Sequence, residues 1–168
     1  MSDQNDVVFN ASGHAAAVFG LLKEYLGPEL EGRAGGFLCV TDKKGLPVLI
    51  SRIGEIPEEK LNQYYRNALE KARRLAFTHA LAGHLLSRQS RDEKRERWTG
   101  AIVGKHWIWS FSGLLEPDDE VLSTLTALRH GDLSHDEACQ RMRAESEDEN
   151  PRFKKLYDRT FIHFKPTA

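Results

Sequence analysis

The sequence predicts an α+β domain, in which a central antiparallel sheet of two or more hairpins is crossed by a long helix. Two hairpin patterns, over residues 36–50 and 98–112, predict the sheet. Between them, an apolar stripe at helical spacing over residues 57–89 predicts the helix. With 168 residues, of which 40% are hydrophobic and 29% charged, the chain has the size and composition of a single folded domain over residues 1–168.

The chain is expected to begin with a frayed arm over residues 1–10, because this stretch is mostly polar. A helix is then predicted from about Ser12, a residue type that caps helix N-termini, to Gly27-Pro28, which ends it. Apolar residues three and four positions apart predict its buried face: Val18, Leu21, Leu22, Tyr25 and Leu26.

The first hairpin is predicted by two apolar runs, 36–41 and 46–50, on either side of a turn that ends in Gly45. Pro47 cannot donate a backbone hydrogen bond, so we expect it at the start of a strand or on a sheet edge. Cys39 lies within the first apolar run and is expected to be a small buried side chain.

The long helical region opens at Pro57, a residue suited to a first helical turn. Its stripe consists of Leu61, Tyr65, Ala68, Ala72, Leu75, His79, Ala82 and Leu86. The favoured interpretation is helical packing across the sheet, as one helix or as two that break at Gly83. A coiled-coil dimer is the alternative, although the central alanines would make a weak zipper. The charged residues 88–97 are interpreted as a solvated helix end and loop.

The second hairpin has its turn at Gly104-Lys105. Strand alternation places Trp107, Trp109 and Phe111 on one face. We expect this aromatic face to pack under the long helix, and a platform for a ligand is the alternative.

The last third of the chain predicts two helices and a docked tail. Acidic residues at 116–120 and a terminating Gly131 bound the first helix. Ser134 and Glu137 form a capping box for the second. Residues 145–150 are expected to be an acidic loop, and the apolar side chains of 151–168 predict that this tail docks on the domain or on a second subunit.

The motifs of the common enzyme classes are missing from the sequence, including the phosphate-binding loop, the nucleophile elbow and the zinc-protease helix. We therefore favour a protein that is not an enzyme. The histidines near Asp132 lie in a turn whose residues are explained by turn and cap chemistry, so no metal site is expected. His79 lies on the helical stripe and is interpreted as a core or boundary residue, with axial ligation of a flat cofactor as the alternative.

Composition narrows the location and the partners of the protein. The net charge of −1 gives no overall attraction to nucleic acid or to anionic membranes, and neither is expected as a partner. No signal peptide and no membrane-spanning run is found, and the two cysteines are too few for a disulfide framework. These features predict a cytoplasmic protein.

The order of elements is similar to the profilin-like architecture. Within it, three stretches resemble the haem-binding GlcG/HbpS-like domain family, which is similar to the corrinoid-associated domain of certain adenosyltransferases. They are the hairpin 40–48 with its Asp-x-x-Gly turn, the helix 68–77 with Lys71-Ala72, and Ser110–Gly113 followed by Asp118–Glu120. The resemblance covers about residues 36–122. It departs at 91–97, where charged residues replace the family's Gly-Gly-Pro-type stretch, and at the tryptophans of the second hairpin.

The resemblance implies a small non-catalytic domain that binds a ligand between helix and sheet, with a tetrapyrrole such as haem as the named possibility. It implies a histidine ligand from the helical region, His79 in preference to His84. Trp107 and Trp109 are expected to line the pocket on a separate ground, as the aromatic platform of the second hairpin. The alternative function is a homo-oligomeric interaction or regulatory module. In that case a homodimer would form through the 61–86 stripe or the apolar tail.

Overall fold

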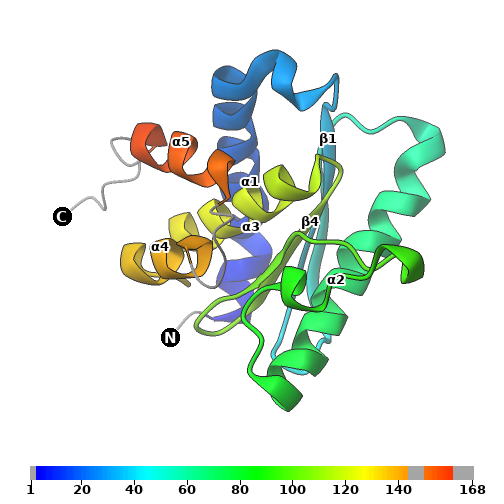
Figure 1. Cartoon of the computed structure of the whole chain (residues 1–168), viewed down its shortest axis with the longest axis vertical. Coiled ribbons are helices and arrows are strands. Elements are labelled where there is room, and N and C mark those ends of the chain that lie inside the picture. Colours follow the sequence, from blue (N-terminus) through cyan, green and yellow to red (C-terminus); the bar gives the residue numbers. More distant parts are fainter. Residues whose placement is uncertain (1–2, 144–149, 161–168) are drawn as a thin grey trace.

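The computed structural model describes residues 3–143 and 150–160. Within them, four strands form one antiparallel sheet in the order β2-β1-β4-β3. The strands are β1 (Gly35–Thr41), β2 (Pro47–Gly54), β3 (Ala101–Val103) and β4 (Ile108–Ser112). Helix α2 (Leu61–Ala82) covers one face of the sheet, and α1 (Gln4–Leu26) and α3 (Glu116–His130) cover the other (Figure 1). The predicted α+β class is confirmed.

Both predicted hairpins form, and the turn of the first follows the expected chemistry. Asp42 accepts hydrogen bonds from the backbone N–H groups of Lys44 and Leu46, and Gly45 adopts a φ of 82°. Pro47 begins β2, which is an edge strand of the sheet, as its missing N–H requires. The second hairpin is shorter than expected, because β3 contains only three residues.

Helix α1 begins well before Ser12, so the expected frayed arm is wrong for residues 4–10. Asp3 caps the helix through the backbone N–H of Asn5. Val7 is completely buried and continues the buried stripe of Ala11 and Ala15 at four-residue spacing. The polar residues that suggested an arm are the exposed side of this amphipathic helix.

Helix α2 is one helix that starts and ends inside the predicted range of 57–89. Gly83 takes a left-handed φ of 69° and donates its N–H to the carbonyl of His79, which ends the helix. Ala68, Ala72 and Leu75 are completely buried against the sheet, so the centre of the stripe is not available to a second helix. Leu86 lies beyond the helix, in a β-bridge with Ile102.

The two faces of the sheet pack against different partners, and this corrects the expected position of the aromatic face. Trp109 and Phe111 belong to the core formed with α1 and α3, while Ile108 faces α2 together with Cys39. Alternation along a strand fixes which residues share a face, but it does not identify the helix that covers them. The alanines and Leu75 of α2 pack with Cys39, Val103 and Ile108 on one face, and the rings of Trp109 and Phe111 belong to the core on the other.

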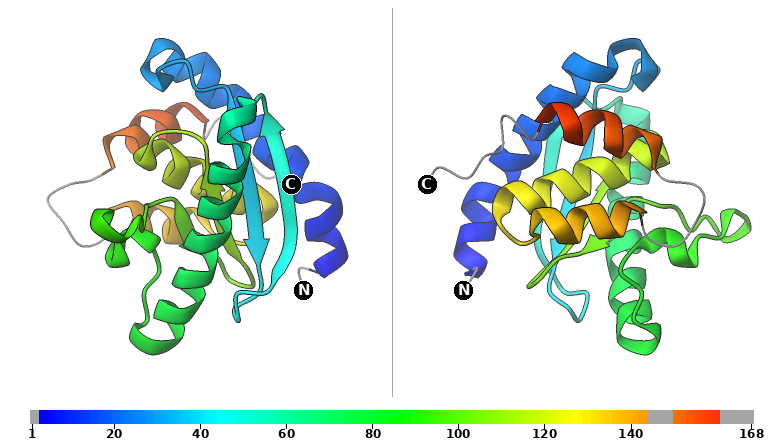
Figure 2. Two further views of the ribbon diagram at one scale, coloured as in Figure 1. Left: turned by 90° about the vertical axis from the view of Figure 1, so that its right-hand side faces the viewer. Right: turned by 60° about the vertical axis from the view of Figure 1, so that its left-hand side comes forward.

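Helices α4 (His135–Arg143) and α5 (Pro151–Thr160) lie beside α3, on the side of the sheet opposite α2 (Figure 2). The predicted capping box forms, with reciprocal hydrogen bonds between Ser134 and Glu137. Phe153 and Leu156 of α5 are buried in the core, while residues 144–149 and 161–168 of the expected loop and tail lie outside the described residues. No helix in the described ranges has the length and hydropathy of a membrane span.

Candidate functional site

Near its start, helix α3 carries three consecutive acidic side chains that are almost completely buried: Asp118, Asp119 and Glu120. Buried carboxylates are rare unless they are paired. The three face cations from three different segments: Asp118 faces Arg152, Asp119 faces Lys71, and Glu120 faces Arg88. The start of α3 is therefore an electrostatic junction that connects α2, α5 and the segment before β3.

Asp119 and Lys71 form the tightest of these pairs. The Lys71 Nζ lies 2.9 Å from the Asp119 carboxylate and 3.0 Å from the carbonyl oxygen of Phe111. The other Asp119 oxygen accepts the backbone N–H of Leu114 at 2.8 Å. Burial raises the pKa of Asp119 to about 6, and the neighbouring Lys71 ammonium opposes this rise. Gly100, with a φ of 134°, leaves room for the lysine, because a Cβ there would lie 2.9 Å from Nζ.

The Asp118 carboxylate has fewer stabilising contacts than that of Asp119. Neither of its oxygens has a hydrogen-bond partner in the described residues, and the Arg152 Nε is 3.6 Å away. Burial raises the pKa of Asp118 above its usual value. Its ionised form is therefore less favourable in the folded protein than in the unfolded chain.

We expect Asp118→Asn to increase the free energy of unfolding at pH 7, since the variant has no charge to bury and Arg152 keeps Glu29 as a partner. The gain should shrink as the pH falls toward about 3, where Asp118 is mostly protonated in both states, and should grow between about pH 4 and pH 7. Urea denaturation at a series of pH values measures this difference. Glu59→Gln, at an exposed position, is the control, and a gain for Asp118→Asn that does not change with pH would contradict the assignment.

A cleft of about 590 Å³ opens above the Lys71–Asp119 pair. We use "the cleft" for the space bounded by α2, by the segment between α2 and β3, and by the connection from β4 to α3. Its walls are formed by Arg33, Gln63, Tyr64, Asn67, Arg91, Trp98 and residues 112–117, with Lys71 and Asp119 beneath. This volume lies within the range of about 300–1,000 Å³ that is typical of small-molecule sites.

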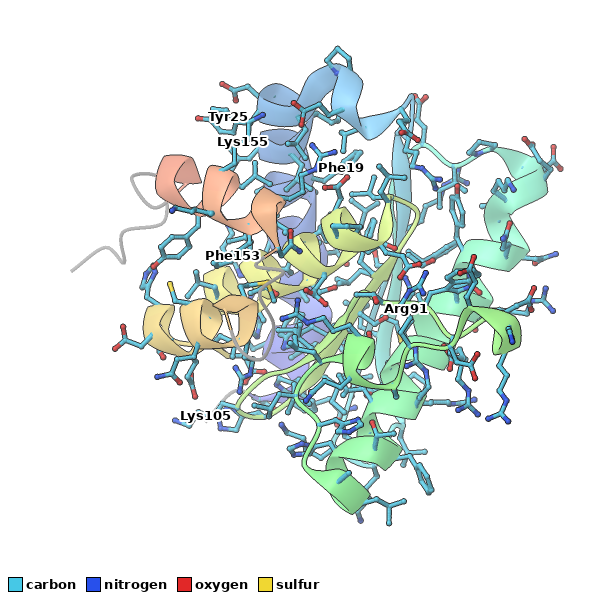
Figure 3. All side chains as sticks on the ribbon, viewed as in Figure 1. Phe19, Tyr25, Arg91, Lys105, Phe153 and Lys155 are labelled. Carbon is cyan, nitrogen blue, oxygen red and sulfur yellow. The ribbon has the colours of Figure 1, made fainter. Side chains whose placement is uncertain are left out.

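One wall of the cleft is an ion pair between Arg91 and Glu116. The Arg91 Nε and Nη2 lie 2.8 Å and 3.0 Å from the two Glu116 oxygens, and the backbone N–H of Thr99 adds a third donor at 3.2 Å. Burial opposes ionisation of Glu116, but the hydrogen bonds from Arg91 and Thr99 hold its pKa below the usual value. The Arg91 guanidinium also lies 5.8 Å from the centre of the Trp98 ring (Figure 3 labels Arg91).

Arg74 holds the segment that carries Arg91 and Trp98. Its Nη1 donates to the Ser87 carbonyl at 2.8 Å and to the Ser90 hydroxyl at 2.6 Å, and its Nη2 donates to the carbonyl of Trp98. One side chain of α2 therefore fixes both ends of an irregular segment, which gives this wall of the cleft a defined position.

Arg33 enters the cleft from the segment before β1. Its Nη1 reaches the carbonyl oxygens of Gly113 and Leu114 at 3.5 Å and 3.4 Å, which are long hydrogen bonds. No carboxylate within residues 3–143 and 150–160 forms an ion pair with it. Arg33 is therefore a half-buried cation without a matching anion in this part of the chain.

The structure does not bring together the three side chains that the sequence proposed for a cofactor. His79 lies near the C-terminal end of α2, with Nδ1 2.8 Å from the carbonyl oxygen of His84. Trp109 is completely buried on the opposite face of the sheet, and Trp107 is half-buried beside the same core. A haem between His79 and these tryptophans does not fit this arrangement, since the sheet lies between them.

The Trp109 indole donates instead to the carboxylate of Asp132 at 2.8 Å. Asp132 also accepts the backbone N–H groups of His106 at 2.8 Å and of Trp107 at 3.1 Å. The sequence analysis explained Asp132 as a turn residue, but its carboxylate also joins the end of α3 to the second hairpin. No group of three or more potential metal-ligating side chains occurs in the described residues.

Sequence reasoning assigned no role to the residues of the cleft. The resemblance had selected the stretches that contain Lys71 and Asp119, but only as family patterns. A usable sign was the position of Lys71, three residues after Ala68 and four before Leu75, which places a lysine within the buried stripe. Arg33, Arg91 and Trp98 come from irregular segments and carry no such sign.

Comparison with known proteins gives a structural likeness. No family model matches the chain, and no curated protein sequence matches it. The chain is similar to the crystal structure of protein ORFY from Klebsiella pneumoniae, of the DUF336 family, with a TM-score of 0.44 and 17% sequence identity over 74% of this chain and 90% of that one.

Proposed function

We propose that this chain is a small-ligand-binding domain without catalytic activity, and that the ligand occupies the cleft. The observation that carries this proposal is a cavity of about 590 Å³ with a buried ion pair beneath it and aromatic and amide side chains on its walls. An apolar body with a few converging polar groups is the usual composition of a small-molecule site.

The walls of the cleft are held by side-chain contacts, which favours binding. The Lys71–Asp119 pair lies beneath it, and Arg74 holds the wall formed by the segment before β3. A site that is already in its binding geometry loses little conformational entropy when a ligand enters.

We propose that the cleft is not catalytic because its ionisable groups are already held by partners within the protein. Lys71 is held by Asp119 and by the Phe111 carbonyl, and Glu116 is held by Arg91 and Thr99. Neither the amine nor the carboxylates are positioned as a free base or nucleophile next to an activating partner.

The resemblance implied a tetrapyrrole, but no histidine within residues 3–143 and 150–160 lines the cleft. We therefore propose a ligand that is smaller and more polar than haem. A haemin titration of the purified protein, followed by its Soret band, should show no saturable site. Saturation at one haem per chain that is lost in His79→Ala would instead support the tetrapyrrole. The homodimer is a separate proposal, which light scattering on the same sample measures.

The binding proposal is tested by a ¹H–¹⁵N NMR screen of the purified protein against small acidic, basic and neutral organic compounds. We expect at least one compound to produce saturable shifts that are largest for the side-chain amide of Asn67, the indole of Trp98 and the backbone of Gly113. If no compound gives saturable shifts in this group, the proposal fails.

A further inference from the structure

We propose that the ligand of the cleft is a small organic carboxylate with a planar body, and that Arg33 binds its carboxylate. This inference rests on the proposed function, because it names the chemical class of the molecule that enters the same cleft. Three properties of the described residues support it: the balance of charge, the free edge of Arg33 and the aromatic walls.

The balance of charge in the cleft leaves one cation without a partner. Its lining contains the cations Arg33, Lys71 and Arg91 and the carboxylates Glu116 and Asp119. Lys71 is paired with Asp119 and Arg91 with Glu116, so the positive charge of Arg33 remains. A neutral ligand would cover this charge without compensation, whereas an anion would pair with it.

The geometry of Arg33 leaves part of its guanidinium available. Both of its hydrogen bonds use Nη1 and reach the carbonyls of Gly113 and Leu114, which holds the group against the β4–α3 connection. Within the described ranges, Nε and Nη2 have no hydrogen-bond acceptor. The charge of Arg33 opposes the rise in the pKa of Asp119, yet neither this carboxylate nor Asp118 is close enough to form an ion pair with it.

A guanidinium edge with two free N–H groups matches the two oxygens of a carboxylate, which it can bind through parallel hydrogen bonds. Arg91 and Glu116 show the same type of bidentate contact within the protein, at 2.8 Å and 3.0 Å. The cleft is therefore built to accept one more carboxylate, supplied by the ligand.

The walls of the cleft favour a flat molecule. Tyr64 and Trp98 contribute aromatic rings, and Gln63 and Asn67 contribute amide groups that can donate and accept hydrogen bonds. About 590 Å³ is enough for a single substituted ring with its carboxylate.

The test uses benzoate, phenylacetate and 4-hydroxybenzoate, each compared with its own primary amide in ¹H–¹⁵N NMR titrations. We expect at least one acid to saturate the resonances of the cleft and to bind at least tenfold more tightly than its amide. Arg33→Gln should reduce the affinity for that acid about tenfold or more and leave the amide unchanged. Arg33→Lys keeps the positive charge but loses the two-pronged guanidinium, so its affinity for the acid should lie between those of the wild type and Arg33→Gln.

Arg95→Gln, at an exposed position in the segment before β3, is the matched control and should bind as the wild type does. The ¹H–¹⁵N spectrum of each variant shows whether it is folded. Equal affinity for acid and amide, failure of all three acids, or an Arg33→Gln variant that binds normally would overturn the inference. Inorganic phosphate that displaces the acid and binds more tightly would also overturn the carboxylate assignment.

These outcomes separate the inference from the proposed function. If amides or other neutral compounds saturate the same resonances, the cleft is a binding site and only the ligand class is wrong. If no compound in the broader screen affects these resonances, the proposed function itself fails.

Discussion

Lys71→Met is expected to lower the free energy of unfolding by about 3–5 kcal/mol, the usual cost of removing one partner from a buried ion pair. The lysine side chain is 2% exposed, and methionine has a similar volume, so packing changes little. The loss arises because Asp119 would remain buried with only the Leu114 N–H as a close donor, and it must either keep an unpaired charge or take up a proton. Urea denaturation followed by tryptophan fluorescence measures the change.

A double-mutant cycle separates the ion pair from other effects of the substitution. Adding Asp119→Asn to Lys71→Met removes the second charge and keeps an acceptor for the Leu114 N–H. The loss in the free energy of unfolding of the double variant should therefore be at least about 1 kcal/mol smaller than the sum of the losses of the two single variants. Lys94→Met, at an exposed lysine, should stay within about 0.5 kcal/mol of the wild type. A loss below about 1 kcal/mol for Lys71→Met would show that the pair is not buried as described.

Asp132→Ala is expected to have the second large effect and to lower the free energy of unfolding by about 3 kcal/mol or more. The variant leaves the N–H groups of His106 and Trp107 and the indole N–H of Trp109 without their acceptor. Hydrogen bonds to a charged acceptor contribute about 1.5–3 kcal/mol each, and an unsatisfied buried donor costs a similar amount. The same urea denaturation measures the loss, and the emission of Trp109 should change as its environment opens.

Asp136→Ala is the matched control for this substitution. Asp136 is exposed in the first turn of α4, four residues along the chain from Asp132, so only the interaction with the helix dipole is lost. We expect Asp136→Ala to lower the free energy of unfolding by less than about 1 kcal/mol. Equal losses for the two variants would contradict the role of Asp132 as the acceptor that joins α3 to the second hairpin.

Local patterns predicted most of the fold because the chemistry that decides these elements lies within a few residues. The Asp42–Gly45 turn, the stop at Gly83 and the capping box of Ser134 each depend on neighbouring residues alone. The start of α1 was missed because its first turn is polar and its burial depends on Val7 contacting distant helices.

Which helices cover the aromatic face of β4 could not be predicted from the sequence, since strand alternation does not distinguish one face of the sheet from the other. The site could not be predicted for a related reason. Arg33, Lys71, Arg91 and Asp119 come from four separate segments, and only the tertiary fold brings them to one cleft. Seen alone, Arg91 was one charge among many in the solvated segment 88–97, and Asp119 was an ordinary acid at a helix start.

The most direct test of the central claim repeats the ligand screen on two tryptophan substitutions in α2. Asn67 lines the cleft, whereas Asn62 is exposed on the same helix and lies outside it. We expect Asn67→Trp to fill the cleft and abolish the binding of every compound that shifts the resonances of Trp98 and Gly113 in the wild type, and Asn62→Trp to bind normally. Compounds that bind Asn67→Trp as well as the wild type would show that the ligand site lies elsewhere.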